Sequence, residues 1–212
     1  MKTVSVKHRC RFRIAGKPES RLEPLPAPSR VAAVPDRIPL IKPRLLVRPG
    51  DRVKAGTALA EDKQNTDIKL LSPAGGAVAD IKYGPRRVIE AIIIEAAEDE
   101  AHETWPAVDA SALSQMSREE TIQALLARGL WLFIRSLPFK AVADPKEAPA
   151  AVWVPLEIKD PFHPEASVYL ETASARNNFL FGIQILRKLC DRVFVYDHAE
   201  TRSEEHTSEL QS

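Results

Sequence analysis

The sequence has little cysteine and no long hydrophobic run. Its two cysteines, Cys10 and Cys190, are far apart, which argues against a disulfide framework and leaves too few ligands for a zinc or iron–sulfur site. No segment reaches the roughly 18 apolar residues that a membrane-spanning helix needs. Charges interrupt the N-terminal stretch MKTVSVKHRCRFRI, so it lacks the apolar core of a signal peptide. We therefore expect a cytoplasmic chain that does not cross a membrane by itself.

Sequence motifs for nucleotide binding and hydrolysis are also absent. Neither GxGxxG nor GxxxxGK[ST] occurs, and no local motif marks a Ser-His-Asp or Cys-His arrangement. The histidines are isolated from one another, apart from His8 beside Cys10, and a zinc site normally has two spaced pairs of ligands. We predict no catalytic residues, no cofactor-binding residues and no metal ligands in this chain.

The net charge of +1 hides an asymmetry along the sequence. Residues 1–48 contain twelve Lys or Arg against three acidic residues, which gives +9 there and leaves −8 for the rest. Such a segment can contact an acidic partner protein or anionic lipid, or it can simply be a solvated surface. Phe12 is the only aromatic residue among these cations, so there is no stacking platform and we expect no nucleic-acid binding.

The first half of the chain has the pattern of a small all-β barrel or sandwich. Eight prolines between Pro18 and Pro49 exclude a long helix. Short apolar pieces then alternate with turn formers, and six of the eight glycines lie at or before Gly84. The expected strands contain residues 45–47, 58–60, 68–71, 77–81 and 88–94.

The second half has the pattern of an α/β domain. Ser117 and Glu120 form a capping box at the start of a helix that Gly129 can end. A strand at 151–156, a helix at 176–189 and a strand at 192–196 predict parallel pairing. The predicted organisation is a basic proline-rich segment (1–29), a β domain (30–96), a linker (97–111), a partial α/β domain (112–201) and a tail (202–212).

The tail RSEEHTSELQS does not continue the pattern of the α/β domain. It contributes no apolar face, and it resembles the in-frame translation of a widely used short-read sequencing adapter over its whole length. We interpret residues 202–212 as an artefact and expect the natural protein to continue beyond about Thr201, so that the second domain is truncated.

Lys63 is the sharpest candidate for chemistry. It follows two acidic residues in a predicted hairpin, where a lipoyl or biotin carrier domain presents the lysine that it modifies. A biotin domain would place Met on both sides of that lysine, whereas this sequence has Asp62 and Gln64. We therefore expect an unmodified, exposed turn lysine, with a carrier domain as the alternative.

Three aromatic residues, Trp131, Phe133 and Phe139, follow the first helix of the second half. They can line a ligand pocket, but aromatic clusters most often pack in a core, and core packing is the expectation.

The order of the motifs resembles the A subunit of the Na+-translocating NADH:quinone reductase. IAGKPE is followed by RPGDRVKAGTALAEDKQN, LLSPAGGAV, RRVIEAIIIE and SREETIQALLARGLWLFIRSLPF, so the resemblance spans about residues 14–197. The residues that carry it, all of unknown role, are Asp62, Lys63, Asn65, Ser72, Pro73, Ala74, Gly76, Gly129, Leu130, Trp131, Arg135, Pro138 and Phe139. The C subunit of the related Rnf electron-transfer complex has a similar barrel and is a further alternative.

The resemblance implies a barrel-sandwich hybrid domain, like that of biotinyl and lipoyl carriers, followed by a truncated α/β domain. It implies a peripheral, non-catalytic subunit on the cytoplasmic side of the bacterial inner membrane, in a complex that oxidises NADH, reduces ubiquinone and exports Na+. The expected partners are the other subunits, which hold the flavins and the iron–sulfur centre, and an anionic membrane surface. The resemblance further implies that this chain takes part in ubiquinone binding or in assembly of the complex, and that it carries no redox centre and no covalent cofactor.

Overall fold

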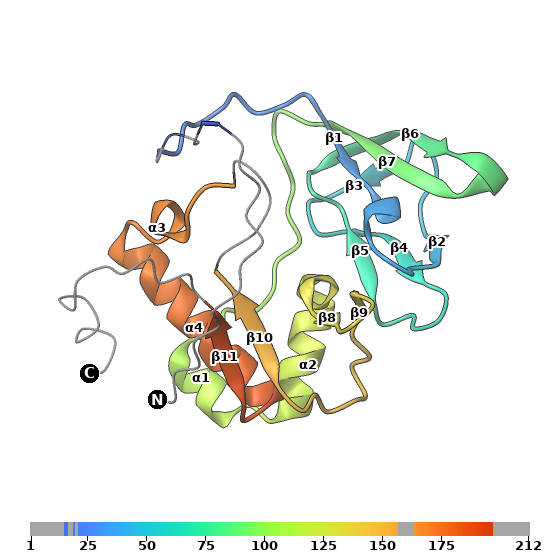
Figure 1. Cartoon of the computed structure of the whole chain (residues 1–212). Coiled ribbons are helices and arrows are strands. Elements are labelled where there is room, and N and C mark those ends of the chain that lie inside the picture. Colours follow the sequence, from blue (N-terminus) through green and yellow to red (C-terminus); the bar gives the residue numbers. More distant parts are fainter. Residues whose placement is uncertain (1–14, 17–18, 20, 157–162, 197–212) are drawn as a thin grey trace. The chain divides into compact units, whose positions relative to one another are not determined.

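The computed structural model describes residues 15–16, 19, 21–156 and 163–196 (Figure 1). The chain forms two compact units, one of residues 25–149 and one that combines residues 1–24 with 150–212. This division places residues 112–149 with the β domain, whereas the sequence pattern assigned them to the second domain. The domain bounds inferred from the sequence pattern stay a prediction. Most of the basic segment 1–29 and all of the tail 202–212 lie outside the described residues.

Two antiparallel sheets form the barrel of the first unit. One has the order β1-β7-β6-β3, with β1 at Arg30–Ala33, β7 at Ile89–Ala96, β6 at Gly76–Tyr83 and β3 at Arg52–Val53. The other has the order β2-β4-β5, with β2 at Pro43–Leu45, β4 at Ala58–Asp62 and β5 at Lys69–Leu71. Two 3-10 turns, η1 (Pro35–Arg37) and η2 (Pro85–Arg87), connect strands. Four of the five predicted pieces, 58–60, 68–71, 77–81 and 88–94, coincide with β4, β5, β6 and β7. The fifth, 45–47, overlaps β2 at Leu45 only, and β1 and β3 were not predicted.

The core of this unit draws side chains from both sheets. Leu59, Ile92 and Ile94 have no exposed surface, and Val78 and Ala60 are almost completely buried beside them. The buried residues of β7 are Ile89, Ile92 and Ile94. Ile92 and Ile94 share one face, as the period of two in a β-strand requires, whereas the step from Ile89 to Ile92 spans three residues, where the register with β6 is irregular.

Residues 97–103, predicted as part of a linker, are hydrogen-bonded to the barrel. The amide of Ala97 donates to the carbonyl of Gly75 (2.9 Å), and that of Ala55 donates to Ala101 (2.8 Å). The amide of Glu103 returns a bond to the carbonyl of Ala55 (2.8 Å). Helix α1 (Ala110–Gln115) follows residues 97–103, and the sequence pattern did not predict it. The side chain of Asp109 caps this helix by accepting a bond from the amide of Ala112 (2.7 Å).

Helix α2 (Arg118–Ala127) begins with the predicted capping box. The hydroxyl of Ser117 accepts a bond from the amide of Glu120 (3.2 Å), and the Glu120 carboxylate accepts one from the amide of Ser117 (2.7 Å). After the helix come the 3-10 helix η3 (Leu130–Phe133) and a short hairpin of β8 (Arg135–Ser136) and β9 (Ala141–Val142).

The described part of the second unit is a small parallel α/β arrangement. Strand β10 (Val152–Pro155) pairs with β11 (Val193–Tyr196) in parallel, as predicted. Helices α3 (Ala166–Tyr169) and α4 (Ala173–Leu189) lie between these strands in the sequence. Only Val168 and Leu189 are buried apolar residues in this part, and Trp153 stacks on Phe194 with ring centroids 4.6 Å apart. The observed architecture is mixed, a β barrel followed by α/β structure, which confirms the predicted fold class.

Within the described residues, no helix combines the length and the apolar character that crossing a bilayer requires.

Candidate functional site

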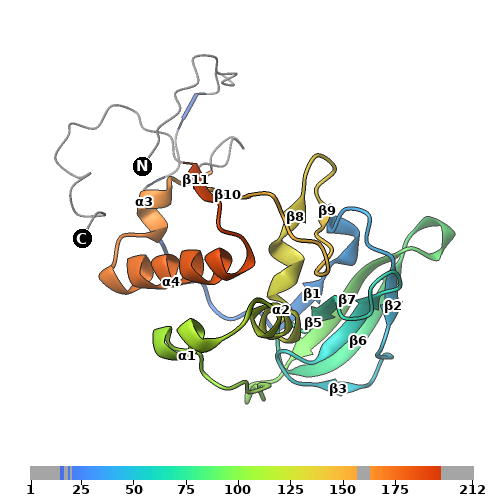
Figure 2. The same cartoon turned by 90° about the horizontal axis from the view of Figure 1, so that it is seen from below.

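The residues that carry the family resemblance fall into two groups in the first unit. One group surrounds the β4–β5 hairpin and the turn before β6. The other runs from the end of α2 to the β8–β9 hairpin (Figure 2).

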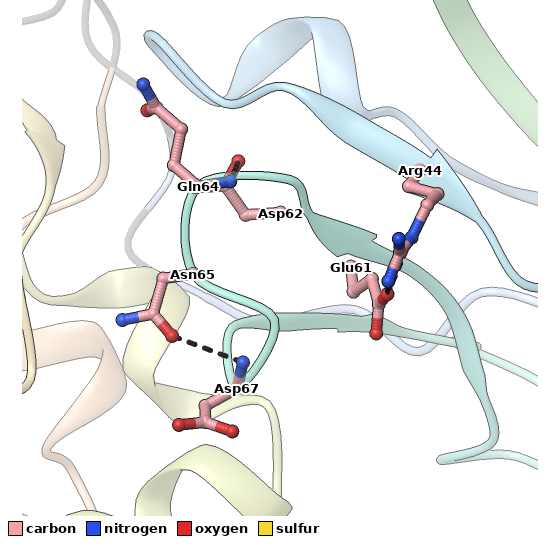
Figure 3. Close-up of polar contacts among 6 residues, drawn as sticks. All are labelled: Arg44, Glu61, Asp62, Gln64, Asn65 and Asp67. Atoms are coloured by element: carbon pink, nitrogen blue, oxygen red, sulfur yellow. Dashed lines mark hydrogen bonds and ion pairs between the residues drawn. The ribbon is translucent and has the colours of Figure 1, made fainter.

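Lys63 lies directly after β4, at the start of the turn, and its side chain is exposed. Asp62 is buried, and its Oδ1 accepts bonds from the backbone amides of Lys42 (3.2 Å) and Gln64 (3.2 Å). The backbone amide of Lys63 donates to the carbonyl of Lys42 (2.9 Å). Further along the turn, Asn65 Oδ1 accepts a bond from the amide of Asp67 (3.2 Å; Figure 3). The polar residues around Lys63 thus fix the backbone of the turn.

The other acidic residue before Lys63 is also structural. Glu61 is 8% exposed and pairs with Arg44 on the neighbouring strand β2, whose Nε donates to Glu61 Oε1 (2.8 Å; Figure 3). A second bond, from Arg44 Nη2, goes to the same oxygen. A buried carboxylate needs such a partner because desolvation disfavours its charge. Neither acidic residue is therefore a free base available to activate the amine of Lys63.

The turn from Ser72 to Gly76 joins the two sheets. Ser72 is buried, with its hydroxyl donating to the carbonyl of Ala74 (2.7 Å) and its amide to that of Thr57 (2.8 Å). Pro73 is exposed. Gly76 has φ +156° and packs so closely on β7 that a Cβ there would overlap the carbonyl oxygen of Glu95. Ser72 therefore stabilises the turn itself, and the close packing of β6 on β7 requires a glycine at position 76.

In the second group, Gly129 and Trp131 attach the η3 segment to the rest of the unit. Gly129 is left-handed (φ +67°), and a Cβ there would lie 2.8 Å from Cγ of Leu71 on β5. Trp131 is buried, and its Nε1 donates to the carbonyl of Ala143 just after β9 (2.8 Å). Residues 129–143 are therefore attached at the start by the packing of Gly129 on Leu71 and at the end by the bond from Trp131 to Ala143.

Between these anchors, four large apolar side chains are exposed. They are Leu130, Phe133, Leu137 and Phe139, and we call them the exposed apolar set. Phe133 and Phe139 are about four-fifths exposed (80% and 78%), so core packing, expected from the sequence for all three aromatic residues, is wrong for these two and right only for Trp131. The reason is that Trp131 takes the inward position of η3, while Phe139 and the exposed Pro138 lie in the β8–β9 turn. Exposed apolar groups of this size often mark a binding surface.

Arg135 lies on β8, between Phe133 and Leu137 of the exposed apolar set in the sequence. Its Nη1 is buried and is the single buried side-chain nitrogen or oxygen without a hydrogen-bond partner in the described part of the chain. Burial lowers the pKa of the Arg135 guanidinium, which nevertheless stays cationic at neutral pH. An unpaired buried donor is unfavourable by roughly 1–3 kcal/mol. The guanidinium of Arg135 would therefore gain a hydrogen bond from any movement that brings Nη1 to an acceptor atom.

Comparison with known protein families covers both groups of residues. The model of the NqrA N-terminal barrel-sandwich hybrid domain matches residues 4–97, and that of the NqrA second alpha/beta domain matches residues 116–211. The two matches follow each other in order and leave few residues of the chain unmatched.

The chain belongs to the NqrA family. Several relatives are named as the A subunit of the Na(+)-translocating NADH-quinone reductase. That of Klebsiella pneumoniae (strain 342) is 34% identical over 180 residues, 84% of this chain and 39% of the relative. That of Yersinia pestis is 32% identical over 206 residues (97% and 45%), and that of Actinobacillus succinogenes is 30% identical over 190 residues (90% and 42%). The chain thus spans less than half the length of these curated relatives.

The NqrA assignment confirms the resemblance found in the sequence. Both family models and these relatives bear the name of this subunit, and not that of a biotin or lipoyl carrier or of an Rnf subunit. The second family model runs through residues 202–211, which lie outside the described residues, so the adapter interpretation of the tail stays a prediction.

Sequence reasoning missed two features of this NqrA chain. The Arg44–Glu61 pair joins residues 17 positions apart, and only the β2–β4 register brings them together. The unpaired guanidinium of Arg135 has no sequence signal at all, because whether a buried nitrogen finds an acceptor depends on the packing around it.

Proposed function

We propose that this chain carries the first two domains of the A subunit of a Na+-translocating NADH:quinone reductase. The observation that carries the proposal is the succession of two NqrA family models along nearly the whole chain. In this proposal the protein is peripheral, on the cytoplasmic side of the bacterial inner membrane, and has no catalytic activity alone. NADH, the flavins and the iron–sulfur centre belong to partner subunits, and the basic N-terminal segment contacts those subunits or an anionic membrane surface.

The test of this assignment is assembly. A tagged form of this chain, expressed in a bacterium that makes the complex but lacks its own NqrA, should co-purify with the remaining subunits. A Lys63→Ala variant should co-purify to the same extent, and the intact mass of the wild-type chain should show no added group, because Lys63 is only an exposed turn residue in this proposal. A lipoyl or biotinyl mass on Lys63 would instead establish the carrier alternative, and failure to bind any other component of the complex would contradict the assignment.

The second part of the proposal is that the protein binds ubiquinone beside Arg135. The exposed apolar set offers surface to an apolar ring and tail. The Arg135 guanidinium lies on the same segment, and its buried Nη1, which has no acceptor, would pair with a quinone carbonyl once the side chain turns outward. A hydrogen bond to a charged donor contributes roughly 1.5–3 kcal/mol, or about 10- to 150-fold in affinity.

A substitution of Arg135 by Met separates binding from folding. The variant should bind a short-chain ubiquinone at least about 10-fold more weakly in equilibrium dialysis, because it lacks the charged donor. It should also be at least as stable as the wild type in urea, since an unsatisfied buried donor has been removed. Phe139→Ser, at an exposed position, should weaken binding without loss of stability. Unchanged ubiquinone affinity in both variants would place the quinone elsewhere.

A further inference from the structure

We propose that the connection between β6 and β7 is a contact point for anionic phospholipid headgroups. This connection, residues 82–88, is called the arginine hairpin here. The inference deepens the proposed function, because it rests on the peripheral membrane location given there and identifies the surface that meets the lipid. The fold itself does not require cations at this turn, although Arg86 and Arg87 begin the motif RRVIEAIIIE.

The arginine hairpin projects from the barrel. In both views the connection between β6 and β7 extends beyond the other strands of the first unit (Figures 1 and 2). Both strands are eight residues long, whereas every other strand of the two sheets has five residues or fewer. The tip is therefore accessible to a flat surface that the body of the barrel would not touch.

Two adjacent arginines occupy strained backbone positions at this tip. Arg86 has φ +56° and Arg87 has φ +60°, in the left-handed region that Gly, Asn and Asp tolerate better. Both side chains are exposed, and among the described residues no ion pair includes either of them. Folding of the turn would favour other residue types, so positive charge is what these two arginines contribute there.

The charges around the tip favour an anionic partner. Lys82 is already paired with Asp80 (Nζ to Oδ2, 2.7 Å), and the carboxylate of Glu90 lies over Gly84 at the base of the turn. Asp80 and Glu90 are the acidic residues closest in sequence to the two arginines within β6, β7 and their connection. The first is paired with Lys82, and the second lies at the base of the turn. Arg48 adds a further cation, because the segment Leu45–Pro49 lines a shallow groove with Tyr83.

Apolar and aromatic side chains accompany these cations. Tyr83 is 48% exposed, with the guanidinium of Arg87 6.0 Å from its ring centroid, and Val88 and Leu46 are exposed to a similar degree. Aromatic and basic residues together are typical of the membrane–water interface, where the ring lies at the level of the headgroups. A stable protein–protein interface needs about 800 Å² on each partner, which a seven-residue tip does not supply. A lipid surface is therefore the occupant that the geometry favours.

The test compares the full chain with a double variant, Arg86→Asn/Arg87→Asn. Asparagine tolerates the left-handed backbone, so the variant should fold and unfold at the same or a higher temperature than the wild type. Binding is measured by co-sedimentation with phosphatidylcholine vesicles that contain about 30% phosphatidylserine, which gives them a negative surface potential. Each cation near such a surface contributes about fivefold in affinity, so the double variant should bind roughly 25-fold more weakly.

A matched control removes two cations from the other hairpin. Lys63→Gln/Lys69→Gln changes the net charge by the same amount at two exposed positions that flank the β4–β5 turn. The basic N-terminal segment is the same in both double variants, so a difference between them isolates the arginine hairpin. The control should bind vesicles within about twofold of the wild type, and pure phosphatidylcholine vesicles should bind all three proteins weakly.

Three results would overturn the inference. They are no binding of the wild type to the anionic vesicles, equal binding of the two double variants, and equal binding to neutral and anionic vesicles. None of these measurements involves another protein. Failure of the chain to assemble with the complex would therefore contradict the proposed function while leaving lipid binding by the hairpin intact, and loss of the lipid result would not affect the assembly result.

Discussion

Replacing Gly76 with alanine should destabilise the barrel by more than about 3 kcal/mol, because the backbone has no room for a side chain there. Gly76 begins β6 and pairs with Val53 on β3 and with Ala96 on β7. A Cβ would overlap the Glu95 carbonyl oxygen and would lie 3.0 Å from its carbon and 3.1 Å from the amide nitrogen of Ala97. All of these atoms belong to the backbone at the end of β7 and just after it, so relief requires β6 and β7 to separate.

Gly50 provides the matched control for this substitution. It also has a positive φ (+94°), but nothing lies within 4 Å of a Cβ built there. Gly50→Ala should therefore report backbone strain alone, at about 1 kcal/mol. Urea unfolding of both variants, followed by circular dichroism, checks the prediction. Equal losses in the two variants would mean that the close approach of β6 to β7 contributes nothing.

The Gly76 result bears on how the resemblance to carrier domains is interpreted. Asp62 and Ser72 lie in the two turns that resemble those of carrier domains. Their side chains form hydrogen bonds with backbone groups and so stabilise these turns. Lys63 has the position of a carrier lysine, but the two acidic residues before it are committed to Arg44 and to the backbone. The shared outline therefore follows from the geometry of the fold and does not require the chemistry of a carrier.

Much of the fold could be predicted because its signals are local. The apolar run of β7 and the capping box at Ser117 each depend on a few neighbouring residues. The parallel pairing of β10 with β11 followed from the order strand, helix, strand. The short strands β1, β3, β8 and β9 and the helices α1 and α3 were missed, since two to six residues leave little periodicity to detect.

The candidate site could be predicted far less well, because it depends on side-chain environment. Trp131 and Phe133 are two residues apart in an apolar run, and nothing local indicates that the first is buried and the second exposed. The same holds for Arg135, whose lack of an acceptor is a property of the packed segment. A resemblance based on motif order selects these residues as a group and assigns none of them a role.

Replacing Trp131 with alanine should destabilise the first unit by about 3–5 kcal/mol, the usual range for a buried large aromatic residue. The indole is buried between η3 and the end of the β8–β9 hairpin, and its Nε1 is bonded to the carbonyl of Ala143. Its removal opens a cavity and leaves that carbonyl without its partner. The loss is measured by urea unfolding with circular dichroism.

Trp131→Phe divides this loss between packing and hydrogen bonding. Phenylalanine keeps most of the apolar contact and lacks the Nε1–H donor, so the variant should be less stable than the wild type by only about 1–2 kcal/mol. Hydrogen exchange at the amide of Ala143, which donates to the carbonyl of Ile134 (3.0 Å), should become faster in this variant. If the indole bond holds the hairpin in place, ubiquinone should also bind the variant more weakly, since Arg135 and Phe139 lie on the segment that the bond secures. A variant with unchanged exchange at Ala143 and unchanged ubiquinone affinity would show that packing alone positions the hairpin.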